Sequence, residues 1–282
     1  MDLEPDDQPL YGAVAARLTE RWPDPNRNGE LRARLFERVH RSVVAHREYQ
    51  TVRVADAPWQ PLSAGVARRV LRSDSCTRVE IQRLAVGAAL DLPDDADAQE
   101  ILLLDGALSS LPTSAAPTGV SGARAYGVRQ RTLGDAAVVA LEASTVYLRH
   151  RLGARAPLPA LEARWWDAAL AASAWVDPGR RRWHASSEGV EVLPLRGDSE
   201  VVSMLVRFAA GASVPDHHHA LDEDCLVLQG EMFLGDILLR TGDYQLAPAG
   251  GSHFGETSDV GVLFFFHGAL DPVLRGETPV KP

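Results

Sequence analysis

The residues best suited to chemistry in this sequence are three consecutive histidines, His217, His218 and His219, followed four residues later by Glu223. If this stretch is a β-strand, His217 and His219 project to one face and His218 to the other, because side chains alternate along a strand. A turn containing Gly and Pro leads later in the chain to His253. Three imidazoles and one carboxylate form a ligand set suited to a single Zn, Fe, Mn, Ni or Cu ion. The alternative is a polar barrel mouth that binds no metal.

Short apolar strands are expected to hold these side chains in place. Residues 201–209, 224–230, 232–240 and 260–268 are apolar stretches separated by Gly, Pro and Asp turns. Short strands with regularly spaced turns are typical of a β-sandwich or a small barrel.

An internal repeat indicates that the chain contains two copies of this unit. When residues 59–106 are placed on residues 183–230 without a gap, 16 of the 48 positions are identical. A chance agreement of composition is the alternative, but ungapped identity over this length favours a duplicated fold unit.

The first copy serves as an internal control for the metal site. Pro93, Asp95 and Gln99 stand where the second copy has its two outer histidines and its glutamate. One carboxylate without an imidazole is a poor transition-metal site. We therefore expect the first copy to be metal-free and to pack against the second copy or to build a dimer interface.

Helices are expected outside the two strand-rich units. Residues 30–49 have apolar residues at helical spacing, with Asn28 as a candidate cap, and residues 10–22 suggest a shorter helix before them. Residues 159–175 begin with Pro and end before a Pro-Gly pair, which predicts a linker helix. Its tryptophans are expected to pack against a barrel or a second subunit, with stacking on a ligand as the alternative: Trp165, Trp166 and Trp175.

These patterns predict a mainly β protein with two tandem barrels, an N-terminal helical segment and a linker helix. The expected divisions are a helical segment at 1–50, a degenerate barrel at 51–156, the linker helix at 157–178 and a metal-binding barrel at 179–282.

Composition excludes several classes of partner. The formal net charge of -9 disfavours nucleic acid and anionic membranes, because both require a basic surface. The two cysteines, Cys76 and Cys225, provide neither a disulfide framework nor a four-cysteine zinc module. No signal-like start and no long apolar run is present, so we expect a cytoplasmic protein. A homodimer that binds a small molecule is the expected assembly.

The residues around the histidines also carry a family resemblance. Gly211, the two outer histidines, Glu223 and Gly230 resemble the first cupin motif at every defined position. Gly242, Pro248, Gly250 and His253 resemble the second motif, although Thr257 replaces its terminal Asn. The resemblance implies a double-stranded β-helix barrel, and it implies that four residues are the metal ligands: His217, His219, Glu223 and His253.

The helix at residues 30–49, the Trp-containing segment after it and the cupin motifs together resemble the ChrR-like cupins. Some of these form the metal-binding half of zinc-dependent anti-sigma factors. Those proteins carry a second zinc site with a Cys-x-x-Cys pair in an N-terminal helical domain, and residues 1–50 here contain no cysteine. Other ChrR-like cupins resemble iron dioxygenases that cleave carbon–carbon bonds beside ketones.

Two functions therefore stay open. The first is a metal-dependent dioxygenase acting on a small ketone-like or diketone-like molecule, with Zn or Fe as the expected ion and Mn or Ni as alternatives. The second is a regulatory protein that uses the site structurally or to sense an oxidant, with a sigma-factor-like partner. For the enzyme, the candidate pocket residues are Cys225, Tyr244, Phe254 and Phe265, with Phe264 and Phe266 beside the last. Each could instead be plain barrel core, and Cys225 a buried, inert thiol.

Overall fold

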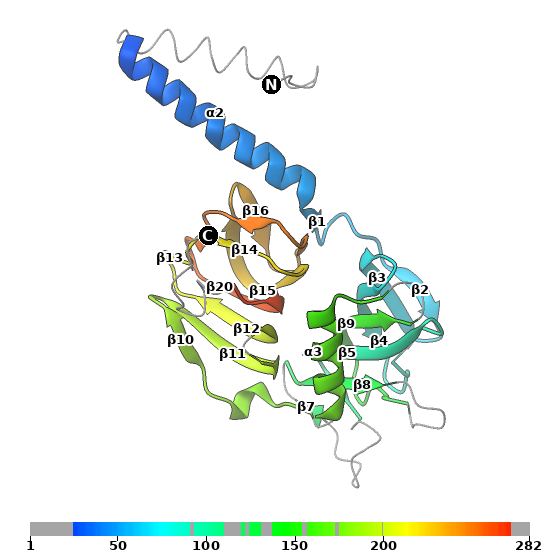
Figure 1. Ribbon diagram of the computed structural model, residues 1–282. Helices are drawn as coiled ribbons and strands as arrows, with labels where there is room; N and C mark the ends of the chain where they lie inside the picture. The colour runs from blue at the N-terminus through cyan, green and yellow to red at the C-terminus, as the bar shows by residue number, and fades with distance from the viewer. Residues whose placement is uncertain are drawn as a thin grey trace. The chain divides into compact units, whose positions relative to one another are not determined.

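Nine strands of the second half of the chain, together with β1 (Gln50–Val52) from the first half, form a 10-stranded antiparallel sheet that curls into a barrel, called the second barrel below (Figure 1). The computed structural model describes residues 25–90, 93–109, 120–121, 124–130, 137–153, 157–172, 175–198 and 200–271. The main path of the sheet consists of β1, β17 (Tyr244–Ala247), β15 (Glu223–Leu234), β20 (Val262–Ala269), β12 (Val201–Phe208), β11 (Val190–Gly197) and β10 (His184–Ser187). Beside this path lie β13 (Ala212–Ser213), β16 (Ile237–Arg240) and β19 (Thr257–Ser258), and a separate pair is formed by β14 (His217–His218) and β18 (Ser252–His253).

A second curled sheet precedes it in the chain and is called the first barrel. Its strands, in sheet order, are β2 (Gln60–Ser63), β3 (Val66–Ser73), β4 (Thr77–Leu84), β9 (Ser144–Leu152), β5 (Ala96–Asp105) and β8 (Tyr126–Gln130). A small pair is formed by β6 (Ala107–Leu108) and β7 (Val120–Ser121). The two-barrel, mainly β architecture expected from the repeat is confirmed.

The predicted linker helix is also confirmed. Helix α3 (Ala160–Ala171) follows Pro159 at its N-cap, and a 3-10 turn, η1 (Pro178–Arg180), follows it at the Pro-Gly pair. The helix contacts β8, β11 and β12 and so lies at the junction of the two barrels (Figure 1). Trp165 and Trp166 are buried in this junction, so they pack as expected, whereas Trp175 lies after the end of α3 and packs, partly buried, against the interior of the first barrel.

Helix α2 (Pro25–Glu48) confirms the N-terminal helix but begins earlier than predicted. Asn28 lies within the helix and so is not at the predicted N-cap position; Pro25 occupies the first turn, where a missing N–H costs nothing. The shorter helix expected at residues 10–22 lies outside the described residues. Met1–Arg47 and Glu48–Pro282 form two separate units. None of the described helices combines the length and apolar character needed to span a bilayer.

The two barrels share one hydrophobic core and differ inside. The shared core contains outward-facing residues of both sheets, among them Tyr147 and Phe265, whose ring centroids lie 5.0 Å apart. The interior of the first barrel is filled by aliphatic side chains such as Leu103 and Leu148. The interior of the second barrel instead contains a cavity beside the histidines. A site for a ligand is therefore found in the second barrel.

Strand β1 belongs to the second barrel although it precedes the first barrel in the chain. It pairs with β17 of the second barrel, with Thr51 opposite Gln245. The segment that begins at Tyr49 is thereby fixed beside the histidines, which nothing in its local sequence indicates. The four expected domain ranges stay predictions.

Candidate metal centre and its cavity

Two short strands bring the histidines together. Strand β14 pairs with β18 in antiparallel register, so that His217 lies opposite His253 and His218 lies opposite Ser252. His217, His219 and His253 are buried, whereas His218 is exposed. The alternation expected of a strand is therefore present, and it turns two of the three consecutive histidines inward.

Glu223 completes the group from the first position of β15. One ligand atom from each of His217, His219, Glu223 and His253 lies within 4.8 Å of the other three. Oε2 of Glu223 lies 3.5 Å from Nε2 of His219 and 3.6 Å from Nε2 of His253. Bonds of about 2.1 Å to one ion place neighbouring ligand atoms about 3 to 4 Å apart, so these separations suit a shared ion.

The rings are held in the form that binds metal. Nδ1 of His217 lies 3.0 Å from the carbonyl oxygen of Pro215. A carbonyl can only accept, so the proton sits on Nδ1 and the lone pair of Nε2 is free to bind an ion. Desolvation lowers the pKa of His217, and desolvation together with the charge of His217 lowers the pKa of His219 to about 4. Desolvation and the neighbouring imidazoles also hold the pKa of His253 well below its usual range.

The unpaired atoms of the group fit a cation. Nε2 of His219 and Oε2 of Glu223 are buried and have no hydrogen-bond partner among the described residues. Buried polar atoms without partners are costly and rare in folded proteins. Burial, and secondarily the charge of Glu256, raises the pKa of Glu223 well above its usual range. A divalent ion would compensate the carboxylate and use the neutral imidazoles, so the residues present fit a bound metal.

Glycine at position 268 leaves room for the carboxylate arm. Gly268 lies on β20 and Glu223 on the neighbouring strand β15. The two residues lie opposite each other, because the antiparallel register pairs Asp224 with His267. A Cβ on Gly268 would lie 2.7 Å from Cγ of Glu223 and 3.0 Å from Cζ of Phe266. The backbone of Gly268 is outside the left-handed region, so the need for glycine here is one of space.

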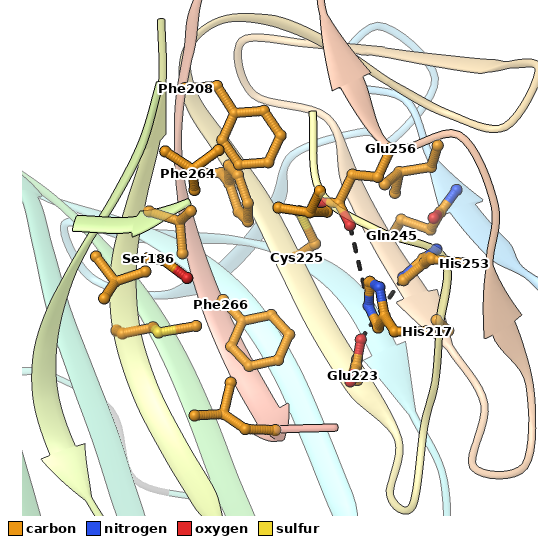
Figure 2. A pocket seen from close by; sticks show the side chains of 18 residues that line it. Ser186, Phe208, His217, Glu223, Cys225, Gln245, His253, Glu256, Phe264 and Phe266 are labelled. Atoms are coloured by element: carbon orange, nitrogen blue, oxygen red, sulfur yellow. Dashed lines mark ion pairs between the residues drawn. The ribbon is translucent and has the colours of Figure 1, made fainter. Parts of the chain in front are cut away.

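A cavity of about 160 Å³ opens next to the group, inside the second barrel (Figure 2). Its polar lining consists mainly of His217, Glu223, His253, Cys225, Gln245 and Glu256. Its apolar wall includes Met204, Phe208, Phe264 and Phe266. Figure 2 shows His217, His253 and Glu223 at one end and the phenylalanines along the other side. A molecule in this cavity would meet the histidines and Glu223 with one end and an apolar surface with the rest.

Comparison with known proteins agrees with this architecture. Residues 171–271 match the family described as the ChrR Cupin-like domain. The chain therefore carries a ChrR cupin-like domain. This domain contains the second barrel except β1, with all four predicted ligands, and its presence confirms the resemblance drawn from the motifs.

Solved structures extend the likeness to both barrels. A proposed dioxygenase from Nostoc punctiforme PCC 73102 is 15% identical with a TM-score of 0.57, over 83% of this chain and 88% of that chain. A variant of oxalate decarboxylase from Bacillus subtilis is 15% identical with a TM-score of 0.55, over 79% of this chain and 77% of that chain. AerE from Microcystis aeruginosa is 15% identical with a TM-score of 0.54, over 76% of this chain and 97% of that chain. At these identities the likeness is one of fold. No curated protein matches the sequence significantly.

Of the predicted pocket residues, one lines the cavity of the cupin-like domain and three do not. Cys225 lies in the cavity wall, two residues after Glu223 on β15, and burial raises the pKa of its thiol well above the usual range. Phe265 turns away into the shared core, because side chains alternate and it is Phe264 and Phe266 that face inward.

Tyr244 and Phe254 also lie elsewhere. Tyr244 is fully buried in the shared core and donates a hydrogen bond to Asp224. Phe254 is 39% exposed because it follows His253 directly and so faces away from it. The prediction that Tyr244, Phe254 and Phe265 line the cavity is therefore wrong. Gln245, the neighbour of Tyr244, faces the cavity instead.

Glu256 is a cavity residue that sequence reasoning missed. It lies in the turn between β18 and β19, with Oε2 4.0 Å from Nε2 of His217 (Figure 2). Desolvation raises its pKa to about 8. Its position, three residues after His253, was the only available signal, and an acidic residue in a loop is ordinarily exposed.

Asp224 was also missed, and it ties the cupin-like domain to the first barrel. It follows Glu223 on β15 and so points to the opposite face of the sheet. There Nε of Arg149 donates to Oδ2 of Asp224 over 3.1 Å, and NH1 of Arg72 donates to Oδ1 over 3.4 Å. Arg149 also pairs with Glu162 of α3. The alternation of Glu223 and Asp224 predicts this opposition once the strand is known.

Tyr49 packs against the histidines from outside. Its ring centroid lies 6.4 Å from that of His219 and 5.3 Å from that of His253, and its hydroxyl donates to the carbonyl oxygen of Ser252. Because β1 follows directly, the pairing with β17 holds this ring in place. Tyr49 therefore supports the positions of two predicted ligands.

Proposed function

We propose that the cupin-like domain binds one divalent transition metal ion through His217, His219, Glu223 and His253, and acts as a dioxygenase-type enzyme on a small ketone-like or diketone-like molecule. The observation that supports this proposal is that the four ligand atoms lie close together and that three of the four residues, His217, Glu223 and His253, line a cavity of about 160 Å³. Structural zinc sites are closed by their protein ligands, whereas catalytic metal sites keep an open position for a substrate.

The ligand set restricts the ion without selecting one. Imidazole suits Zn, Fe, Ni and Cu, and a carboxylate adds affinity for Mn. Mn(II) centres are named for the Bacillus subtilis oxalate decarboxylase, which shares the fold at 14% identity. We propose Zn or Fe as the resident ion, with Mn and Ni as alternatives. When bound, such an ion supplies Lewis acidity toward an oxygen ligand and, if it is redox-active, a route for electrons.

The chain's own residues would orient and shield the substrate. The Pro215 carbonyl fixes the ring of His217, and Tyr49 supports the rings of His219 and His253. The phenylalanine wall excludes water from the cavity and offers an apolar surface to the substrate. These contacts fix the geometry in which a substrate oxygen can approach the ligand cluster.

The proposal is tested by metal analysis of natively loaded protein, followed by oxygen uptake over a panel of diketones and aryl ketones. We expect about one metal ion per chain, because Pro93, Asp95 and Gln99 leave the first barrel without the ligand set. Iron together with oxygen consumption supports an enzyme. Protein that takes up no metal after metal-supplemented expression contradicts the proposal.

A regulatory function is the second candidate, and Tyr49 is the observation that favours it. Tyr49 lies directly after α2 in the chain, and its ring contacts the rings of His219 and His253. A movement of these two rings on metal binding would therefore displace the residue that follows α2. Tightly held zinc without oxygen consumption would favour this candidate. A sigma-factor-like partner and a homodimer are part of it as proposals.

A further inference from the structure

The size of the cavity limits the ligand. At about 160 Å³ it is close to the cavity of about 150 Å³ that, in another protein, binds one benzene molecule. A ligand that fills it therefore has about six to eight non-hydrogen atoms. Larger substrates would require the barrel wall at Phe264 and Phe266 to move, and both residues lie within the paired part of β20.

The charges around the cavity limit the ligand further. Two carboxyl groups, of Glu223 and Glu256, line it, and none of the described lining residues is Lys or Arg. Sites that recognise carboxylates ordinarily use Arg or Lys, which match the charge and donate hydrogen bonds. A divalent ion held by Glu223 has one net positive charge, which can balance one anionic group but not two.

Glu256 adds no positive charge in either of its forms. As a carboxylate it repels an anionic ligand, and as a carboxylic acid it leaves the charge of that ligand unbalanced. The neighbouring wall, with Met204 and Phe208, is apolar and cannot solvate a charge. A dicarboxylate in this cavity would hold one group without a partner, which is costly in a buried site.

We propose that this cavity selects neutral oxygenated molecules of about six to eight non-hydrogen atoms and rejects dicarboxylates of the same size. This inference rests on the proposed metal site and names the charge and size of what that site accepts. It also separates this chain from oxalate-type substrates, which are dianions.

Three probes of one shape test the inference. Acetylacetone, acetoacetate and malonate each have about seven non-hydrogen atoms in the same connectivity, and carry about zero, one and two negative charges at neutral pH. Each is titrated by calorimetry into the zinc-loaded full chain, since zinc is not redox-active. The zinc content is measured again after each titration. We expect the dissociation constant to rise along the series, by at least about tenfold between acetylacetone and malonate.

A positive charge placed in the cavity lining should weaken this preference for neutral molecules. Gln245 is buried, lines the cavity, and donates from Nε2 to Oγ1 of Thr51 over 3.0 Å. Gln245→Lys adds a cation to the lining that also contains Glu256, and Gln245→Met has a similar length and loses the same hydrogen bond without adding charge. We expect Gln245→Lys to narrow the ratio between malonate and acetylacetone by at least about tenfold, and Gln245→Met to leave it unchanged.

Each outcome has a distinct meaning. Malonate that binds the wild-type protein as tightly as acetylacetone, with zinc retained, overturns the inference. Retained zinc with no binding of any of the three probes also overturns it, while the metal site stands. Protein that holds no zinc overturns the proposed function and this inference together. If Gln245→Lys does not fold, the wild-type series alone decides.

Discussion

Replacing Gly268 by alanine should weaken metal binding without altering any predicted ligand. A Cβ at this position would lie 2.7 Å from Cγ of Glu223, whereas ordinary contacts begin at 3.4 Å. The Glu223 side chain must therefore retreat by at least about 0.7 Å. Carboxylate–metal bonds are about 2.0 to 2.2 Å long, so a displacement of this size removes the carboxylate from bonding distance or strains the site.

The expected size of the effect follows from what such neighbours contribute. Changes to residues that orient metal ligands typically weaken metal affinity by about 10- to 100-fold, and we expect Gly268→Ala to fall in this range. The backbone of Gly268 is one that alanine can adopt, so the fold should survive, with an overpacking cost of about 1–3 kcal/mol.

The assay is competition for zinc against a chromophoric chelator, with the melting temperature of the metal-free protein measured in parallel. Gly153→Ala is the matched control, because a Cβ there meets nothing closer than Cβ and Cγ of Asp97 at 3.7 Å. Unchanged zinc affinity in a folded Gly268→Ala variant would refute the reasoning, since Glu223 would then not be a ligand held against this glycine.

Three further perturbations address the same site and the barrel junction. His253→Ala should lose the ion and lower the melting temperature of the loaded protein, while the exposed His218→Ala should do neither; equal metal content in the two variants, measured by elemental analysis, would contradict the face assignment. Tyr49→Ala removes a ring that packs on two predicted ligands and should weaken zinc affinity by about tenfold in the chelator assay, and an unchanged affinity would show that the ring gives no support. Burial alone would raise the pKa of Glu162, but Arg149 holds it well below its usual range. Stability from Glu162 is therefore complete above its unfolded pKa of about 4.3 and is lost as the pH falls below it. Glu162→Gln should cost about 3–5 kcal/mol at pH 7 and less at pH 3 in denaturant titrations, and an equal cost at both would exclude the ion pair as its cause.

The ligand group could be predicted because its information is local. Two histidines at i and i+2 must share a face of any strand, and the spacing to Glu223 matches the first cupin motif. The repeat predicted two barrels for a similar reason, since ungapped identity requires no knowledge of long-range contacts. The exposed position of His218 followed from the same alternation.

The cavity wall could not be predicted from the same pattern. Three consecutive phenylalanines on β20 give no alternation signal, because the strand is buried on both faces, by the cavity and by the shared core. Phe265 was therefore assigned to the wrong face. Tyr49 is a different case: its contact with His253 depends on β1 crossing to β17, a pairing across almost 200 residues that no local pattern specifies.

The first barrel has other polar groups at the positions that correspond to the candidate metal site. Gln99 occupies the position of Glu223 in the repeat, and His150 pairs opposite it where the second barrel has Gly268. Nε2 of Gln99 lies 3.3 Å from Nδ1 of His150, whose Nε2 lies 3.2 Å from Oε1 of Glu80. These buried groups pair with one another, although Oε2 of Glu80 has no hydrogen-bond partner among the described residues.

The first barrel also supports the second barrel through a residue on its outer face. Arg149 precedes His150 on β9 and so projects from the other face, where it binds Asp224, the neighbour of Glu223. Strand β15, which begins with the predicted carboxylate ligand Glu223, is thus held on its opposite face by a buried, charged hydrogen bond. Since such bonds are costly to break once buried, loss of Arg149 should loosen Glu223 as well as the junction. The first barrel then contributes to the candidate metal site by fixing β15, which is a more specific role than packing alone.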